Sequence, residues 1–342
     1  MTFEEFIMQA REMNASDIHL TVGAPTVVRV NGELRKYTEL SDQVVNRTIL
    51  SILSAEQEKM LTEGKDIDFS FELKNGARQR VNVFRQSGKL AACIRLLNAE
   101  IPTLEELKMP PVLLEFAKKR RGLVLVTGPT GAGKSTTLAA LMEYITIEDP
   151  IEYRYKQEKA TIHQRELGRD VPSFHEALRS ALREDPDVIL IGEMRDYETI
   201  SLAMTAAETG HLVFGTLHTS SAAQTVDRII DACPIHSQDQ VRSQLASMIQ
   251  GIIAQTLIPR ADGKGRVAAV EVMIGTDAIR NLIRSAKINM METTMAAGAR
   301  DGMCTLNASL ANLYKTGQIS YETALEYATD RGEMEKKLLS GI

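Results

Sequence analysis

A glycine-rich loop near the middle of the chain constrains the fold more than any other feature. Residues 128–135 read GPTGAGKS and match the pattern G-x-x-x-x-G-K-S. The loop follows the apolar run LVLVT and precedes an apolar helical stripe, which is the strand–loop–helix context of a phosphate-binding loop. The residues expected to contact a nucleotide are Gly128, Pro129, Thr130, Gly131, Ala132, Gly133, Lys134, Ser135 and Thr136.

The chemistry of the loop predicts ATP as ligand and Mg²⁺ as its partner. Its glycines let backbone N–H groups close around phosphate oxygens, and the N-terminus of the following helix adds positive potential. Lys134 is expected to bridge the outer phosphates and Ser135 to ligate Mg²⁺. The alternative is a chance glycine-rich turn, but the agreement of strand, loop, lysine, serine and helix argues against it.

Three more polar side chains follow apolar runs that are typical of buried parallel strands. Glu193 follows VILIG and could reach the water shell of the metal, so it is a second candidate metal residue. Glu148 follows a short run before Asp149-Pro150 and is a candidate general base. His218 ends HLVFGTLH and could sense the γ-phosphate. The alternatives are a solvated strand-end glutamate, an Asp-Pro turn and a structural histidine.

Composition limits the other classes of function. A chain of 342 residues with 44% hydrophobic residues can bury two cores, and its net charge of −5 gives no general attraction to nucleic acid. Cys93, Cys233 and Cys304 form no CxxC pair, which favours free thiols in a reducing compartment and makes zinc unexpected. No apolar run approaches the roughly 18 residues that span a bilayer, which predicts a cytosolic protein or one that docks on a membrane through a partner.

Two patterns divide the chain. Residues 1–100 predict a small α+β domain, with a helix over 3–10, a strand over 18–22, hairpins around Asn31-Gly32 and Asn75-Gly76, and a last strand over 91–97. Three prolines mark a linker over 101–111. Residues 112–342 predict an α/β domain with parallel strands, mostly helical after about residue 277.

Two apolar stripes in the second domain are typical of core helices. One runs from Leu138 to Ile145 and the other from Val241 to Ile252. The first stripe leads directly into TIEDPIEY, with no turn residues and little room for a strand, so the 145–146 junction indicates either a deletion or an omitted loop.

Arginines cluster on the second hairpin of the first domain and its neighbouring strand. Arg80 and Arg95 are the two of interest. Solvated strand faces explain most such clusters, but arginines that reach across a subunit boundary could stabilise transition-state charge on a neighbour's ATP.

Taken together, these motifs resemble the motor ATPases of type II secretion and type IV pili. The likeness runs along nearly the whole chain and includes NASDIHL, the glycine-rich loop, TIEDPIEY, GEMRD, GHLVFGTLHT and AIRNLIR. The last of these is similar to the box of the twitching-motility, or pilus retraction, ATPases. The resemblance implies a RecA-like P-loop ATPase domain, an N-terminal PAS-like α+β domain and a homohexameric ring with ATP between subunits.

The resemblance also implies roles for particular residues. Glu148 takes the catalytic role of the acidic box, Glu193 the Walker B role, His211 and His218 the role of the histidine box, and Arg80 and Arg95 the arginine-finger role. It implies an inner-membrane pilus platform protein as partner and a cytoplasmic location at the inner membrane. The lack of paired cysteines favours retraction over extension, because extension and secretion relatives usually carry a four-cysteine zinc element.

The chain departs from the family pattern at one further position, because Arg284 is followed by Ser285 where the family box usually ends in Glu. The alternatives to a retraction motor are a pilus-assembly or type II secretion ATPase, a nucleic-acid translocase and a nucleotide-binding regulator without turnover. The presence of Lys134, Glu148 and Glu193 together argues against the regulator.

Overall fold

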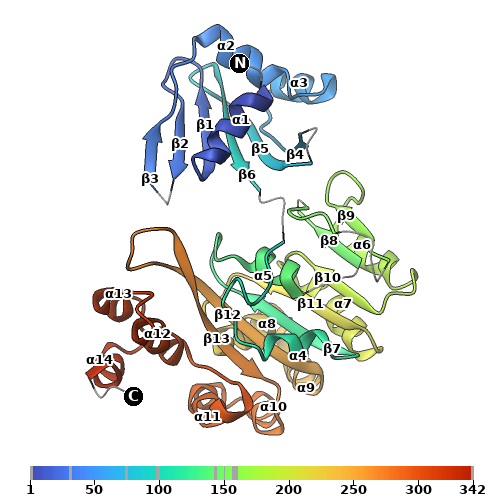
Figure 1. Ribbon diagram of the computed structural model, residues 1–342. Coiled ribbons are helices and arrows are strands. Elements are labelled where there is room, and N and C mark those ends of the chain that lie inside the picture. Colours follow the sequence, from blue (N-terminus) through green and yellow to red (C-terminus); the bar gives the residue numbers. More distant parts are fainter. Residues whose placement is uncertain are drawn as a thin grey trace. The chain divides into compact units, whose positions relative to one another are not determined.

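The computed structural model describes residues 3–30, 33–73, 76–97, 101–141, 145–149, 151–155 and 161–339. The chain forms two compact units, the first made of Met1–Glu100 with Pro150–Arg154 and the second of Ile101–Asp149 with Tyr155–Ile342 (Figure 1). Among the described residues, no helix is long and apolar enough to cross a membrane. Cys93, Cys233 and Cys304 are free cysteines in the structure.

The first unit is an antiparallel sheet covered on one face by helices. Its elements are α1 (Phe3–Glu12), β1 (Ala15–Thr21), β2 (Val27–Val30), β3 (Glu33–Lys36), α2 (Asp42–Leu50), α3 (Ala55–Thr62), β4 (Ile67–Glu72), β5 (Arg78–Gln86) and β6 (Lys89–Leu96). The strand order is β3-β2-β1-β6-β5-β4. Phe6 and Ile7 of α1 and Ile49 of α2 pack against the inward side chains of the strands.

Both expected hairpins are present as antiparallel pairs. β2 pairs with β3, and β4 pairs with β5. Asn31-Gly32 and Asn75 lie outside the described residues, while Gly76 has the positive φ of +83° that such a turn favours. The α+β pattern of residues 1–100 is therefore found in the structure.

The second unit is a mostly parallel sheet with helices on both faces. Its first half comprises α4 (Leu113–Ala117), β7 (Gly122–Thr127), α5 (Lys134–Leu141), β8 (Ile145–Glu148), β9 (Gln164–Glu166), α6 (Phe174–Ala181), β10 (Val188–Ile191), α7 (Tyr197–Glu208) and β11 (Leu212–Leu217). Its second half comprises α8 (Ala222–Asp231), η1 (Ile235–Ser237), α9 (Gln238–Met248), β12 (Ile249–Pro259), β13 (Arg266–Ile274), α10 (Asp277–Arg284), η2 (Ile288–Met290), α11 (Met291–Ala297), η3 (Gly298–Asp301), α12 (Leu306–Lys315), α13 (Tyr321–Glu326) and α14 (Arg331–Leu339).

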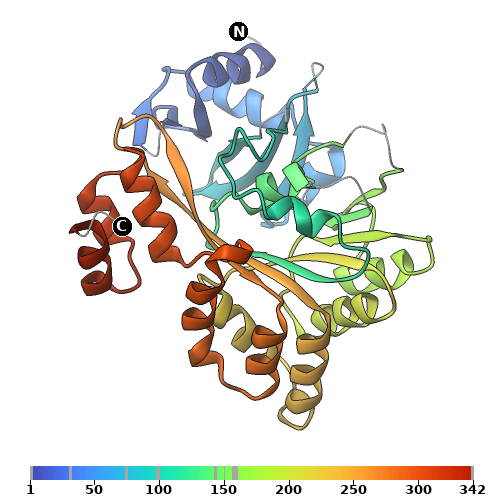
Figure 2. The same ribbon diagram turned by 60° about the horizontal axis from the view of Figure 1, so that its bottom comes forward.

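The strand order of this sheet is β13-β12-β7-β11-β10-β8-β9, and only the pairing of β12 with β13 is antiparallel among those described. One face packs against α6 to α11, and the other packs against α4 and α5. The last three helices cover the outer part of β12 and β13, as Figures 1 and 2 both show. Leu104 and Met109, from the stretch for which a linker is expected, pack into the core of this unit.

Two expectations about helices were wrong. Helix α9, which carries the first residues of the Val241 stripe, ends at Met248. The last two residues of the stripe, Ile249 and Ile252, belong to the long strand β12. Helix α5, which carries the first residues of the Leu138 stripe, ends at Leu141. Ile145, the last residue of that stripe, is the first residue of strand β8. In both cases the residues that continue the apolar spacing are Ile, which pairs equally well into a buried strand.

Candidate active site

The glycine-rich loop sits at the carboxyl end of β7, in the middle of the parallel sheet. Gly128 has a φ of +141°, and a Cβ placed there would lie 2.2 Å from the backbone oxygen of Gln255. Gly133 has a φ of +85°, and its Cβ would lie 3.0 Å from Nε2 of Gln255. The positive φ therefore favours glycine at both positions, and at Gly128 the nearby backbone leaves no space for a Cβ. The loop and strand β12 are in close contact.

Gln255 on β12 braces the loop and was not identified from the sequence. Its side chain is 3% exposed. Nε2 donates a hydrogen bond to the carbonyl of Ala132, and Oε1 accepts one from Oγ1 of Thr137 at 2.9 Å. The signal was hidden because the expected helix ran to Ile252 and no strand was expected directly after it, and only the strand brings Gln255 beside the loop.

The first turn of α5 carries the expected phosphate and metal residues. α5 begins at Lys134, so Ser135 and Thr136 lie in its first turn. The ammonium of Lys134 donates to the carbonyls of Gly128 at 2.8 Å and Pro129 at 3.2 Å, which places its charge directly over the loop. A cation at this position and the N-terminal end of the helix together favour an anionic ligand.

Glu193 lies just beyond the end of β10 and is held by two partners. Its Oε1 lies 2.9 Å from Nε2 of His218, and its Oε2 lies 2.7 Å from the guanidinium of Arg195. The hydrogen bond from Arg195 is the largest cause that lowers the pKa of Glu193, burial opposes it, and the charges of Arg195 and His218 add to the lowering. Glu193 is therefore maintained as a carboxylate. The contact between His218 and Glu193 was not expected from the sequence.

Glu148 is a buried carboxylate at the end of β8, with 8% of the residue exposed. Its Oε1 accepts hydrogen bonds from Oγ1 of Thr146 at 2.7 Å and from Nε2 of Gln164 at 3.1 Å. Thr146 precedes Glu148 by two residues and shares its face of the strand, while Gln164 is the cross-strand partner of Thr146 on β9. The i−2 spacing of Thr146 was a readable signal that the sequence analysis did not use.

Gly192 allows the end of β10, which precedes Glu193, to pack closely against the end of β8, which carries Glu148. A Cβ on Gly192 would lie 3.0 Å from the carbonyl oxygen of Ile147 and 3.2 Å from the Cα of Glu148, and its N–H donates to that carbonyl at 2.8 Å. Because β7, β11, β10 and β8 are parallel neighbours, the P-loop, His218, Glu193 and Glu148 leave the same edge of the sheet. Three strand spacings of about 4.8 Å separate the two outermost strands of this set, a span of about 14 Å.

His211 lies at the other edge. It precedes β11, whereas His218 follows that strand, so about 23 Å of extended chain separates them. Its Nδ1 lies 3.0 Å from the carbonyl of Ala206 and 3.3 Å from Oγ1 of Thr209, at the C-terminal end of α7. Within one chain the structure does not bring His211 to the P-loop, and its contacts there are those of a helix-end histidine.

Arg80 and Arg95 belong to the first unit and face each other across β5 and β6. Arg80 forms a bidentate pair with Asp68, with its NH2 group 2.7 Å from Oδ2 and its Nε 3.2 Å from Oδ1. Arg95 donates from Nε to Oδ1 of Asp17 at 3.0 Å. The structure thus brings the two arginines together on one face of the sheet, where each is paired with a carboxylate.

The chain is similar to known proteins along nearly its whole length. The family model for type II/IV secretion system proteins matches residues 1–331. The chain is 49% identical to the "Type IV pilus retractation ATPase PilT" of Pseudomonas aeruginosa, over 96% of this chain and 98% of that protein. It is 47% identical to the "Twitching motility protein" of Neisseria gonorrhoeae, over 90% of this chain and 85% of that protein.

Solved structures show the same likeness. The pilus retraction motor PilT with bound ADP matches with a TM-score of 0.88 at 46% identity, covering 98% of this chain and 99% of that one. The ATPase DotB of Legionella pneumophila matches with a TM-score of 0.83 at 29% identity, covering 100% and 97%. The expected RecA-like α/β fold with an N-terminal α+β domain is confirmed. The chain therefore belongs to the type II/IV secretion system protein family, and it is a nucleotide-binding P-loop ATPase.

Proposed function

We propose that the chain hydrolyses ATP at the carboxyl edge of its parallel sheet to power retraction of a type IV pilus. The observation that carries the catalytic part is the convergence of the P-loop, the Glu193–His218 pair and Glu148 at one sheet edge. The likeness to the pilus retraction motor with ADP supports the direction of movement.

Each residue has a distinct part in the proposed reaction. Lys134 neutralises the β- and γ-phosphates, which the backbone N–H groups of the loop also contact. Glu148 accepts the proton of the attacking water, and the hydrogen bonds from Thr146 and Gln164 fix the orientation of its carboxylate. His218 follows β11, the strand between β7 and β10, and this position supports a role in reporting the γ-phosphate to Glu193.

The oxygen donors at this edge fit Mg²⁺, which prefers hydroxyl, carboxylate and water ligands. Ser135 would ligate the ion directly, and Glu193 would hold one of its waters. The bound ion would neutralise charge on the phosphates. The salt bridge from Arg195 keeps Glu193 ionised, which is the state that such a role requires.

The proposal includes a homohexamer that works in the cytoplasm and is attached to the inner membrane through a pilus platform protein. ATP would lie between subunits, with Arg80 and Arg95 of one subunit near the phosphates of the next. Within one chain the two guanidiniums pair with Asp68 and Asp17. In this arrangement His211 acts in its own chain as a structural residue.

Two experiments test the proposal at separate levels. The first measures the ATPase rate against protein concentration together with the mass of the particle formed in Mg²⁺ and ATP. Activity that rises cooperatively with a six-subunit particle supports the ring, and full activity in a monomer contradicts it.

The second experiment expresses the chain in a twitching-deficient strain that lacks its own retraction ATPase. Restored twitching with normal pilus number supports retraction, and the Lys134→Ala variant serves as the inactive control. If the chain instead restores pili to a strain that cannot assemble them, the assembly ATPase is the correct reading.

A further inference from the structure

The start of α8 is fastened to the sheet at both ends of one row of residues. Thr127 on β7, Ala254 on β12 and Glu271 on β13 are successive cross-strand partners. Cross-strand partners point to the same face of a sheet, so these three side chains form a row beneath α8. The small side chain of Ala254 in the middle leaves room for the helix to approach.

Hydrogen bonds hold the two ends of this row. The N–H of Ala222, the first residue of α8, donates to Oε1 of Glu271 at 2.6 Å. One turn later, Oγ1 of Thr225 lies 3.5 Å from Oγ1 of Thr127, which can donate to it, because the hydroxyl proton of Thr225 goes to the carbonyl of Ser221 at 2.7 Å. Glu271 is 5% exposed, and Ala222 and Thr225 are fully buried. The bond from Ala222 to the buried Glu271 is the shorter of the two.

The segment before α8 carries His218. Oγ1 of Thr219 lies 2.7 Å from Oγ1 of Thr225, and Nε2 of His218 lies 2.9 Å from Glu193. Only three residues separate His218 from the amide that Glu271 holds. A shift of the first turn of α8 would therefore move the imidazole away from Glu193.

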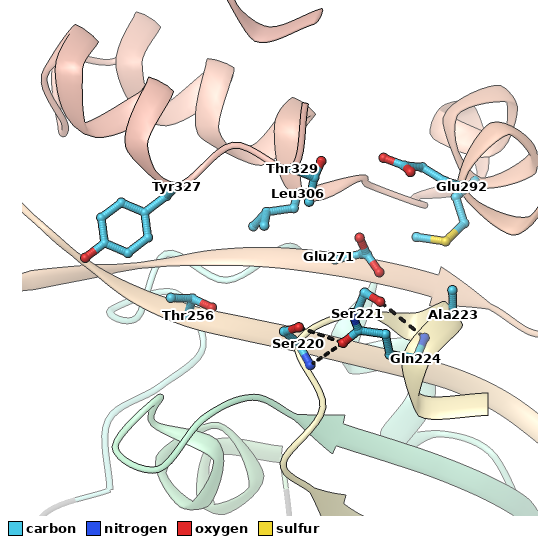
Figure 3. Close-up of a pocket in the computed structure, with 11 residues that line it drawn as sticks. Ser220, Ser221, Ala223, Gln224, Thr256, Glu271, Glu292, Leu306, Tyr327 and Thr329 are labelled. Atoms are coloured by element: carbon cyan, nitrogen blue, oxygen red, sulfur yellow. Dashed lines mark hydrogen bonds between the residues drawn. The ribbon is translucent and has the colours of Figure 1, made fainter. Parts of the chain in front are cut away.

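A cavity beside Glu271 increases the importance of the hydrogen bond from Ala222 to Glu271 for the position of α8. The cavity has a volume of about 350 Å³ and lies between the Ser220–Gln224 segment, strands β12 and β13, and the C-terminal helices. Figure 3 shows Glu271 between Ser221 on one side and Leu306 on the other, with Glu292 farther along the same cavity. Because side chains do not fill this space, packing alone does not fix the start of α8 on this side.

We propose that Glu271 is a positioning residue for catalysis, which holds the first turn of α8 and through it the His218 imidazole at its distance from Glu193. This inference rests on the proposed role of His218 in turnover. Glu271 contacts neither nucleotide nor metal in this proposal. Its effect should therefore fall on kcat and leave nucleotide affinity unchanged.

The test is a double-mutant cycle on the purified full chain, with kcat and KM for ATP as readouts. Glu271→Met removes both carboxylate oxygens at similar length, and Glu271→Gln keeps one oxygen that can accept from Ala222. We expect Glu271→Met to lower kcat by about tenfold or more with KM unchanged, and Glu271→Gln to recover most of the rate. Glu292→Gln, in the same cavity, is the matched control and should turn over normally.

The His218→Ala background distinguishes a positioning role from a general structural one. In that background Glu271→Met should cause no further loss, because the group it positions is gone. An equal further loss would overturn the inference, as would a higher KM with normal kcat. A normal rate in Glu271→Met beside a slow His218→Ala would refute only this inference, whereas a normal rate in His218→Ala would refute the proposed role of His218 itself.

Discussion

Replacing Gln255 with methionine would remove the side-chain hydrogen bonds between strand β12 and the P-loop region while nearly conserving the length of the side chain. The variant loses the bond to the Ala132 carbonyl and the bond to the Thr137 hydroxyl. Each lost hydrogen bond costs about 1 kcal/mol, and a buried partner left unsatisfied costs about 1–3 kcal/mol. Since Gln255 is buried at 3% exposure, water cannot easily replace it. We expect a loss of about 2–4 kcal/mol in the free energy of unfolding.

The same change should weaken nucleotide binding, because Ala132 lies inside the loop whose amides would contact phosphate. If half of the lost energy is a loss of loop order, affinity for ATP falls by roughly five- to thirtyfold. A fluorescent ATP analogue measures the Kd, and urea unfolding measures stability.

The matched control is Gln250→Met on the same strand. Gln250 donates to the carbonyl of Arg121 at 3.2 Å, in an exposed position before β7. It should leave the Kd unchanged and reduce stability by less than about 1 kcal/mol. A Gln255→Met variant with wild-type Kd would refute the view that β12 orders the P-loop.

Three further predictions concern the rest of the site. Glu148→Gln should bind ATP normally but lower kcat by about 10²-fold or more if Glu148 is the base; normal turnover in a single-turnover assay would exclude that role. Arg80→Ala should be inactive alone but regain activity when mixed with Lys134→Ala, because mixed interfaces join an intact arginine to an intact P-loop; absence of rescue argues against an arginine acting in trans. Burial raises the pKa of Glu271 above its usual value, so its contribution to stability is present at low pH and is lost as pH rises through the folded pKa. Urea unfolding across pH should show a fall in wild-type stability over that window and a smaller fall in Glu271→Gln; parallel curves would contradict the shift.

The likeness of a chain to a motor ATPase does not fix its direction of movement. The sequence gives evidence for retraction through AIRNLIR and through the lack of paired cysteines, and the relatives named for pilus retraction agree. Complementation of twitching, together with pilus number, is the measurement that separates retraction from assembly.

The sequence by itself determined the features that depend on local spacing. The GPTGAGKS loop and the buried strands before it and before Glu193 follow from residue type and order. A P-loop works through its own backbone and the helix that follows it, so a contiguous stretch carries enough information to identify it.

Only the tertiary structure decided which distant residues support that loop and its neighbours. Gln255 lies 123 residues after the Ala132 carbonyl it contacts, and Glu271 lies 49 residues after Ala222. The first contact depends on β12 lying beside β7, and the second depends on β13 lying beside β12. The first apolar residues of β12 continue a helical spacing that concealed the strand. The positions of His211 and His218 also depend on the tertiary structure. Strand β11 separates the two histidines, so His218 lies at the carboxyl edge of the sheet and His211 lies at the opposite edge. Which residues meet across a sheet is set by strand order and register, and a single sequence leaves both undetermined.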